Sequence, residues 1–212
     1  MNSSSSTECP CCLAATEPFV LDRLTFHRCP ACGFIMKDPS HHPSPEAEQA
    51  RYDQHQFAPD DGYDRMMEAF LQDSVLPFLS HGSALDFGCG RTGNLIGRLR
   101  DQGFAAAGYD PFYAPDPAAL SARYDLVTAT EVVEHFRDPK TSWRRLFALV
   151  APGGTLSVTT RFIPADFAGW WYRRDLTHLC FYTERALQSV AGRHGFKVIH
   201  TDGCNAITFH RD

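Results

Sequence analysis

The stretch that decides the fold is Ala84-Leu85-Asp86-Phe87-Gly88-Cys89-Gly90-Arg91-Thr92-Gly93, near the middle of a 212-residue chain. Its apolar beginning predicts a buried strand, and a helix is expected to begin at its last glycine. Gly88 and Gly90 let the backbone turn tightly and lie against a bound molecule, and Gly93 lets the helix pack close to the strand. The stretch therefore predicts a strand, a turn and a helix that bind a nucleotide-like molecule.

Strands and helices alternate outward from this turn. The pattern predicts strands over 83–87, 104–109, 125–129 and 154–160, and helices over 46–57, 63–79, 93–102, 139–150 and from 183 onward. Such alternation is typical of parallel strands joined by right-handed helical crossovers, so we expect a doubly wound α/β sheet. Near the C-terminus Asp202-Gly203 separates strands expected over 196–201 and 204–210, which is a strong hairpin signal. The mostly parallel sheet should therefore end in an antiparallel hairpin.

Two carboxylates flank the glycine turn. Asp110 ends the strand after the turn, where a carboxylate can accept hydrogen bonds from both ribose hydroxyls of a nucleoside. Asp86 lies just before the first glycine, where it would repel the diphosphate of a nicotinamide cofactor. It would attract a cofactor that carries an ammonium and a sulfonium. The alternative is a packing turn with a solvated aspartate, but the pair favours S-adenosylmethionine.

Two cysteine pairs precede this region. Cys9-x-x-Cys12 and Cys29-x-x-Cys32 have 16 residues between them, the spacing of a four-thiolate zinc ribbon. Two residues between cysteines let a tight turn aim both sulfurs at one ion, and four thiolates leave no open position, so the Zn²⁺ should be structural. The segment has few apolar residues, so metal binding would supply its stability. Disulfides and reduced core cysteines are the alternatives, and Cys11 is a competing ligand with worse geometry.

Five motifs in order resemble the class I S-adenosylmethionine-dependent methyltransferases: Leu85 to Gly90, Gly108-Tyr109-Asp110, Tyr124 to Val127, Glu131 to His135, and Leu149 to Gly154. A four-cysteine ribbon before such a domain resembles a subgroup of these enzymes. The resemblance implies a Rossmann-like sheet of seven strands whose last strand is reversed. It also implies cofactor contacts around the turn and the neighbouring strand ends, at Asp86, Gly88, Cys89, Gly90, Asp110, Pro111, Phe112, Thr130 and Glu131.

The sequence departs from the family pattern in two places. The glycine loop has one residue more than the commoner G-x-G-x-G, so Arg91 or Thr92 is expected to bulge. Only 14 residues lie between Asp110 and Asp125, which barely fits a helix and a third strand, so this unit should be shortened. Phe112 and Tyr113 are then the nearest candidates for stacking on the adenine.

Two segments could handle the substrate. Methyl transfer depends chiefly on orientation, and a general base is needed only when the acceptor must lose a proton. Glu131 and His135 lie at a strand end and the turn that follows, although His135 and its neighbour Glu134 could instead cap a helix. The loop 167–178 leaves the carboxyl end of a strand and should lie over the cofactor crevice.

Within this loop we expect His178 to act as the base and the aromatic residues to form an apolar wall. Arg173 or Arg174 could hold an anionic group of the substrate. The alternative is that the aromatic side chains only pack and that Asp175 only pairs with an arginine. If His178 acts as the base, replacing it with alanine should abolish turnover; if the loop only packs, turnover should not change.

The domain boundaries follow from composition. Residues 1–8 are serine-rich and expected to be disordered, 9–37 form the ribbon, 38–45 form a proline-rich linker, and 46–212 form the methyltransferase domain. There is no signal peptide or membrane span, so we expect a cytoplasmic protein with reduced thiols. The net charge is −5, and the basic residues form no cluster, which argues against nucleic-acid and anionic-membrane partners.

Three functions remain open from the sequence. The first is methyl transfer to a small-molecule acceptor, favoured by the acidic net charge and the aromatic loop. The second is an RNA or protein methylase whose ribbon recognises the macromolecule. The third is a cofactor-binding regulator without catalysis, whose ribbon docks a partner.

Overall fold

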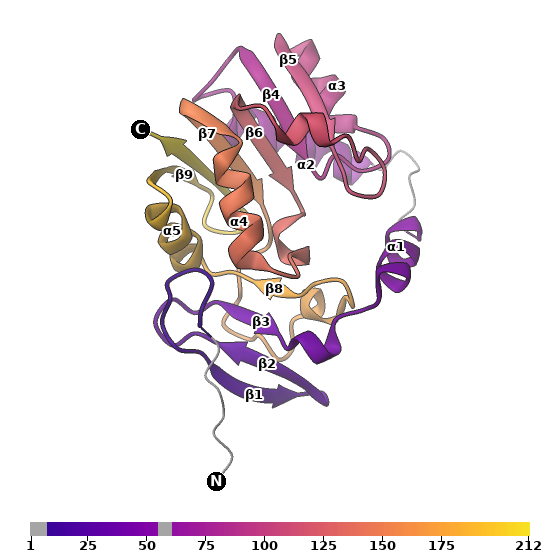
Figure 1. The fold of residues 1–212 in the computed structure, drawn as a ribbon, viewed down its shortest axis with the longest axis vertical. Coiled ribbons are helices and arrows are strands. Elements are labelled where there is room, and N and C mark those ends of the chain that lie inside the picture. The colour runs from indigo at the N-terminus through magenta and orange to yellow at the C-terminus, as the bar shows by residue number, and fades with distance from the viewer. Residues whose placement is uncertain (1–7, 55–60) are drawn as a thin grey trace.

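The computed structural model describes residues 8–54 and 61–212, and within them the chain forms two β-sheets. The larger sheet has six strands in the order β5-β4-β6-β7-β10-β9, and the smaller has four in the order β1-β2-β3-β8. The smaller sheet lies beneath the larger one in Figure 1. Residues 1–7 of the expected disordered N-terminus lie outside the described residues. Glu8, the last residue of that segment, pairs with Lys140.

The larger sheet is the predicted doubly wound one. Its parallel strands are β4 (Gly82–Phe87), β5 (Phe104–Tyr109), β6 (Tyr124–Thr130) and β7 (Val150–Thr159). The predicted antiparallel ending is present, because β10 (Ala206–Arg211) runs antiparallel to β7 and forms a hairpin with β9 (Phe196–Thr201). Asp202 tightens the hairpin, since its carboxylate accepts hydrogen bonds from the amides of Cys204, Asn205 and Ala206.

The family resemblance implied seven strands, and that expectation is wrong for the described residues. The segment between β5 and β6 holds a short 3-10 helix, η2 (Pro117–Leu120), in place of a full helix and a third strand. Asp116 caps η2 through the amide of Ala118. The predicted shortening of this unit is confirmed, and it leaves β5 as an edge of the sheet.

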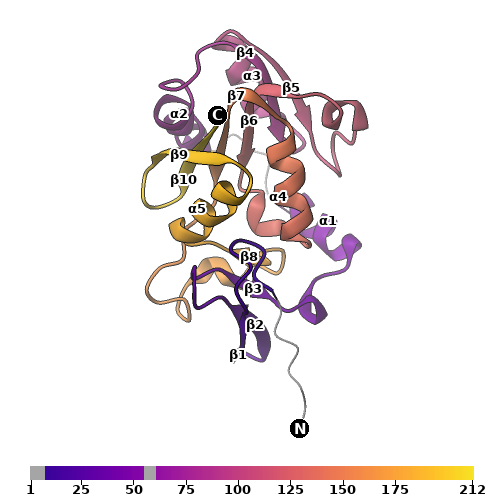
Figure 2. The same cartoon turned by 60° about the vertical axis from the view of Figure 1, so that its left-hand side comes forward.

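Helices cover both faces of the larger sheet. On one face α2 (Asp61–Ser74) and α3 (Asn94–Asp101) pack Met67, Leu71, Leu95 and Leu99 against the strands. On the other face α4 (Pro139–Ala148) and α5 (Glu184–Arg193) bury a second apolar cluster that includes Trp143, Phe147, Leu187 and Val190. Figures 1 and 2 show α4 and α5 together in front of this sheet. Asp138 and Thr183 cap α4 and α5, as polar residues at helix starts commonly do. None of the helices in the described ranges has the length and apolarity needed to cross a bilayer.

The smaller sheet joins distant parts of the chain. Its strands β1 (Glu17–Leu21), β2 (Leu24–Arg28) and β3 (Ile35–Lys37) come from the N-terminal segment, but β8 (Cys180–Phe181) comes from the segment after β7. Between β3 and α2 lie η1 (Pro39–His41) and α1 (Pro45–Asp53). Two further 3-10 helices, η3 (Val133–His135) and η4 (Trp171–Arg174), follow β6 and β7. The N-terminal segment is therefore built into the fold through β8.

Candidate functional site

The glycine turn between β4 and α3 has the conformation that its glycines predicted. Gly88, Gly90 and Gly93 have φ angles of 81°, 63° and 56°, which side-chain-bearing residues seldom adopt. A Cβ on Gly88 would lie 2.3 Å from the Val132 side chain, whereas a Cβ on Gly90 would meet nothing within 4 Å. Gly88 is therefore required by packing, and Gly90 leaves open space beside the turn in which a bound molecule can lie.

Asp110 lies at the end of β5 and faces the same turn. Its carboxylate accepts hydrogen bonds from the amides of Gly90 at 3.1 Å, Phe112 at 2.8 Å and Tyr113 at 3.0 Å. These amides fix the orientation of the carboxylate. Oδ1 accepts two of the three hydrogen bonds and Oδ2 accepts one, so Oδ2 keeps further acceptor capacity. Pro111 follows directly and is exposed, and the Cys89 amide donates to the Tyr109 carbonyl at 3.1 Å.

Asp86 ends β4 beneath the turn and is 2% exposed. The Thr128 hydroxyl donates to its carboxylate at 2.9 Å, and Asp86 forms no ion pair with any cation in the described ranges. Its pKa is raised to about 7, chiefly by burial and also by the nearby charge of Asp110. A buried carboxylate in this state is stabilised by a cation that binds beside it.

Glu131 follows Thr130 at the carboxyl end of β6, and its backbone is in the left-handed region with a φ of 53°. Such a conformation in a residue other than glycine is often found at functional sites. The side chain accepts hydrogen bonds from the hydroxyls of Thr159 at 3.3 Å and Tyr172 at 3.1 Å. Burial raises the pKa of Glu131 to about 7, and the neighbouring Glu134 contributes to that rise.

Glu134 and Tyr172 form a buried pair that the sequence did not assign to the site. The Tyr172 hydroxyl donates to one Glu134 oxygen, while the other Glu134 oxygen is buried without a hydrogen-bond partner in the described residues. Burial raises the pKa of Glu134 to about 7 as well. The sequence interpretation treated Glu134 as a possible helix cap and Tyr172 as part of an apolar wall. The sequence does not show that η3, which carries Glu134, and η4, which carries Tyr172, meet here.

The structure brings His135 and His178 together, with ring centroids 4.9 Å apart. Nδ1 of His135 bonds to the Thr177 carbonyl at 2.9 Å, and Nδ1 of His178 bonds to the Tyr172 carbonyl at 2.8 Å. Because a carbonyl accepts, each Nδ1 carries the proton, and Nε2 of each neutral ring keeps a lone pair. Burial lowers the pKa of both rings, that of His178 to about 3, so both are neutral at pH 7.

Arg173, one of the two arginines expected to hold an anionic group of the substrate, is engaged inside the protein instead. Arg173 is 3% exposed and donates to the carbonyls of Phe167 and Ala168 and to the Asp22 carboxylate. Its guanidinium therefore ties η4 to the turn between β1 and β2. Asp175 does pair with an arginine, namely Arg51 at 2.7 Å, as the alternative interpretation of this loop expected.

Helix α1 lies beside the crevice and contacts both sides of it. Tyr52 packs edge-on against Phe112, with ring centroids 5.5 Å apart, and against His135 at 5.3 Å. The Tyr113 hydroxyl donates to Asp53 at 2.9 Å. The residues expected to stack on the adenine are therefore already packed under α1, a helix whose position the sequence did not reveal.

The four predicted zinc ligands lie in one cluster. The sulfurs of Cys9 and Cys32 are 3.6 Å apart, those of Cys12 and Cys29 are 3.4 Å apart, and all four lie within 4.8 Å of one another. A zinc–sulfur bond of about 2.3 Å places the corners of a tetrahedron about 3.8 Å apart, so the cluster fits the ion. Cys11 is buried but lies outside this group.

The two cysteine turns have matching backbone geometry. In the first, the Leu13 amide donates to the Cys9 carbonyl and the Cys9 amide donates to Ala14. In the second, Gly33 donates to Cys29 in the same way, and the Cys29 amide donates to Phe34. Leu13 and Gly33 both have positive φ angles, of 69° and 80°. Paired turns of this kind aim two sulfurs each at a shared point.

A protein-family model described as a methyltransferase domain matches residues 61–201. The chain belongs to this methyltransferase family. Curated relatives include uncharacterized methyltransferases of Mycobacterium bovis and Mycobacterium tuberculosis, each 38% identical over 52 residues. These matches span 24% of the chain and only 26% of each relative's length.

Solved structures show the same fold at low sequence identity. A 1,6-didemethyltoxoflavin-N1-methyltransferase from Burkholderia thailandensis, solved with its substrate and S-adenosylhomocysteine, has a TM-score of 0.56 at 17% identity and covers 92% of this chain and 99% of its own. A magnesium protoporphyrin IX methyltransferase from Synechocystis PCC 6803, solved with S-adenosylhomocysteine, has a TM-score of 0.54 at 16% identity and covers 81% of this chain and 96% of its own. The methyltransferase therefore has the Rossmann-like fold predicted from its sequence.

Proposed function

We propose that this methyltransferase binds S-adenosylmethionine along the glycine turn and transfers its methyl group to a small-molecule acceptor. The observation that carries the proposal is the pair of carboxylates on either side of the turn. Asp86 is buried without a cation in the described residues, and Asp110 is held in place by three backbone amides. An ammonium and sulfonium would compensate the charge of the first, and a ribose diol would donate to the second.

The remaining cofactor contacts are proposed at the turn and the adjoining strand ends. Gly88, Cys89 and Gly90 would form the floor of the site, where the open space beside Gly90 leaves room for the cofactor. Pro111 and Phe112 would border the adenine, and Thr130 and Glu131 would close the side facing the acceptor. The family membership and the S-adenosylhomocysteine in both named structural relatives support this placement.

The acceptor would lie against Glu131, His135 and His178. When bound, S-adenosylmethionine supplies the methyl group by in-line displacement, which depends on orientation of the acceptor atom. The Nε2 lone pairs of the two neutral histidines would accept hydrogen bonds from the acceptor and orient it. Glu131 has a pKa of about 7, close to that of an effective base at neutral pH, so its carboxylate would take the acceptor's proton where one must leave.

We further propose that Cys9, Cys12, Cys29 and Cys32 hold a structural Zn²⁺, with residues 9–37 as the ribbon and 46–212 as the methyltransferase domain. The sulfur spacing and the paired turns support this. Thiolate ligands require a reducing compartment, which fits a cytoplasmic location. A closed set of four thiolates leaves the chemistry to the crevice in the larger sheet.

A small-molecule acceptor is supported by the net charge of −5 and by the buried, tightly packed residues around His178. The test is labelled-methyl transfer from S-adenosylmethionine into fractionated cell extract, followed by mass analysis. We expect the label in a low-mass fraction. Label in RNA or protein, with binding that weakens steeply with salt for RNA, would contradict the small-molecule assignment. Cofactor binding without transfer to any fraction would instead indicate a regulator.

A further inference from the structure

The cysteine module has no role yet in the proposed chemistry, but its backbone runs directly into the acceptor side of the site. Strand β3 pairs with β8 through Ile35 opposite Phe181 and Met36 opposite Cys180. The Lys37 amide extends this ladder by donating to the Leu179 carbonyl at 2.8 Å. Leu179 directly follows His178, so the module and the segment that carries His178 belong to one sheet.

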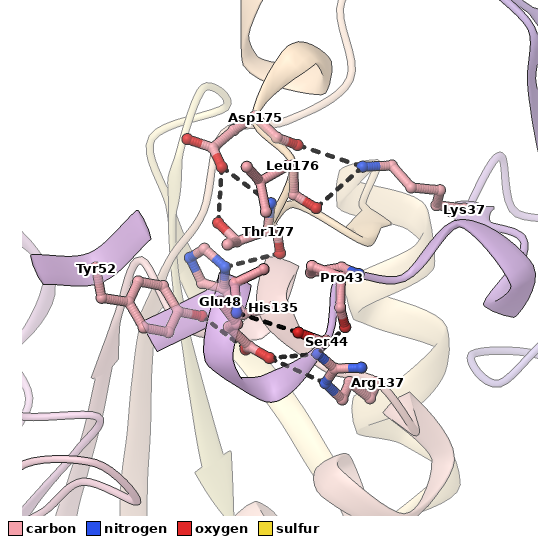
Figure 3. Close-up of polar contacts among 11 residues, drawn as sticks. Lys37, Pro43, Ser44, Glu48, Tyr52, His135, Arg137, Asp175, Leu176 and Thr177 are labelled. Atoms are coloured by element: carbon pink, nitrogen blue, oxygen red, sulfur yellow. Dashed lines mark hydrogen bonds and ion pairs between the residues drawn. The ribbon is translucent and has the colours of Figure 1, made fainter. Parts of the chain in front are cut away.

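Lys37 is the side chain that makes the connection specific. It is 3% exposed, and its Nζ donates to the carbonyls of Asp175 at 3.3 Å and Leu176 at 3.4 Å (Figure 3). Lys37 forms no ion pair with a carboxylate in the described part of the chain. The Asp175 carboxylate lies beyond ion-pair distance and stabilises the ammonium only at longer range, so the buried Nζ also depends on the dipoles of these two carbonyls.

The segment 175–178, which Lys37 contacts, also contacts both histidines. The Asp175 carboxylate accepts from the Thr177 amide at 2.9 Å and from its hydroxyl at 2.7 Å. The Thr177 carbonyl, fixed in this way, accepts from His135 Nδ1, as Figure 3 shows. The His178 amide donates to the Asp175 carbonyl at 3.3 Å, the same oxygen that Lys37 binds.

The second cysteine turn is anchored beside this segment. The Cys32 carbonyl accepts from the Thr183 hydroxyl at 2.6 Å, and Thr183 is the N-terminal cap of α5. From the other turn, the Pro10 carbonyl accepts from Arg193 in the last turn of α5 at 2.7 Å. The module is therefore fixed at both turns to the helix that follows β8, and Lys37 reaches the turn 175–178 from a rigid base.

We propose that the four-cysteine module is a built-in part of the acceptor site, and that Lys37 is a positioning residue that orients His135 and His178 through the turn 175–178. The proposal rests on the proposed function for the role of the two histidines. It assigns the module to the interior of the enzyme and not to docking of a separate macromolecule. The two carbonyls, not a substrate, are the partners of the lysine.

The test compares Lys37→Met, which removes the donor, with Lys37→Arg, which restores one, in zinc-loaded full-length protein. The control is Lys140→Met, because Lys140 is exposed and its ammonium pairs with Glu8, away from the turn 175–178. Two readouts are needed: the ring nitrogen signals of His135 and His178 by NMR, and labelled-methyl transfer set against affinity for S-adenosylhomocysteine.

For Lys37→Met we expect both histidine ring signals to shift and methyl transfer to fall about tenfold or more, since small misplacements of orienting groups have effects of this size. Zinc content and S-adenosylhomocysteine affinity should stay within about twofold, and Lys37→Arg should recover at least part of the transfer rate. A folded Lys37→Met protein with unchanged histidine signals and an unchanged rate would overturn the proposal.

If Lys37→Met does not fold, Lys37→Ala carries the same test, because it also removes the donor and leaves space that water can fill. Unchanged histidine signals in folded Lys37→Ala together with an unchanged rate of methyl transfer would then overturn the proposal. The NMR readout needs no acceptor, so failure of the proposed function is seen separately, as absence of S-adenosylhomocysteine binding to the wild-type protein.

Discussion

The proposed cofactor side and the proposed acceptor side of the site are built in different ways. The cofactor side comes from one continuous stretch, β4 to α3, with the adjoining end of β5, and its geometry follows from glycines and backbone amides. The acceptor side is assembled from β6, η3, η4, α1 and the cysteine module, through side-chain contacts between residues far apart in the chain. Sequence motifs therefore describe the first side well and the second poorly, and substitutions should separate the two.

The largest effect is expected at Gly88. Gly88→Ala places a Cβ against Val132 and forces alanine into the left-handed region, so both the fold and the turn should be damaged. We expect a lower melting temperature and at least a hundredfold weaker S-adenosylhomocysteine binding by calorimetry. Gly90→Ala is the matched control for stability, because its Cβ meets no neighbouring atom. Equal melting temperatures for the two variants would contradict the packing argument.

The next largest effect is expected at His178, and it should change methyl transfer but not cofactor affinity. His178→Ala removes the ring beside His135 and the Nε2 lone pair that would orient the acceptor, so methyl transfer should fall about a hundredfold, the size expected when a reacting group is misplaced. Affinity for S-adenosylhomocysteine should be unchanged. His81→Ala, at an exposed position, serves as the control. An unchanged transfer rate would remove His178 from the mechanism.

Asp110→Asn tests the cofactor side without a large change in volume. The amide cannot accept all the backbone hydrogen bonds that the carboxylate accepts, and it loses the charge that strengthens bonds from a ribose diol. We expect S-adenosylhomocysteine to bind about tenfold more weakly in calorimetry. Asp116→Asn, at a helix cap outside the crevice, should leave that affinity within about twofold. Comparable losses in both variants would indicate a general effect on the fold.

The smallest effect is a pH dependence of cofactor affinity that originates at Asp86. In the free protein its pKa is about 7, and a cationic cofactor favours the ionised carboxylate. Binding below pH 7 must therefore release a proton, so affinity should be constant above about pH 7 and fall by up to tenfold per unit below it. Asp86→Asn should bind more weakly with little dependence on pH. An equally steep dependence in this variant would assign the proton to another group.

The sequence predicted the larger sheet well because the spacing of apolar residues and the positions of glycines are local signals. The strands at 104–109 and 196–201 were predicted with their observed bounds, and Asp202-Gly203 does form the hairpin. The sequence could not show that β8 completes the N-terminal sheet, because a two-residue strand has no periodicity. The position of α1 over Phe112 was equally hidden, since it depends on the Tyr52 contacts.

For the candidate site, the sequence named the carboxylates and histidines that we propose for it, but it did not reveal their surroundings. Asp110, Glu131, His135 and His178 were chosen because they end or follow strands, and parallel strands end at one edge of a sheet. Asp86 was chosen because it lies directly before the first glycine of the turn. The Tyr172–Glu134 bond, the internal role of Arg173 and the reach of Lys37 require tertiary contacts across 38 to 151 positions of sequence. No local pattern reports contacts over such separations.

The most direct test of the account is calorimetry of S-adenosylhomocysteine binding to folded, zinc-loaded protein at pH 8 and at pH 6. We expect one binding event per chain at both pH values, with affinity up to about tenfold lower at pH 6 because a proton must leave the Asp86 carboxyl group. Absence of binding heat at either pH, with the protein folded, would contradict a cationic nucleoside site between Asp86 and Asp110.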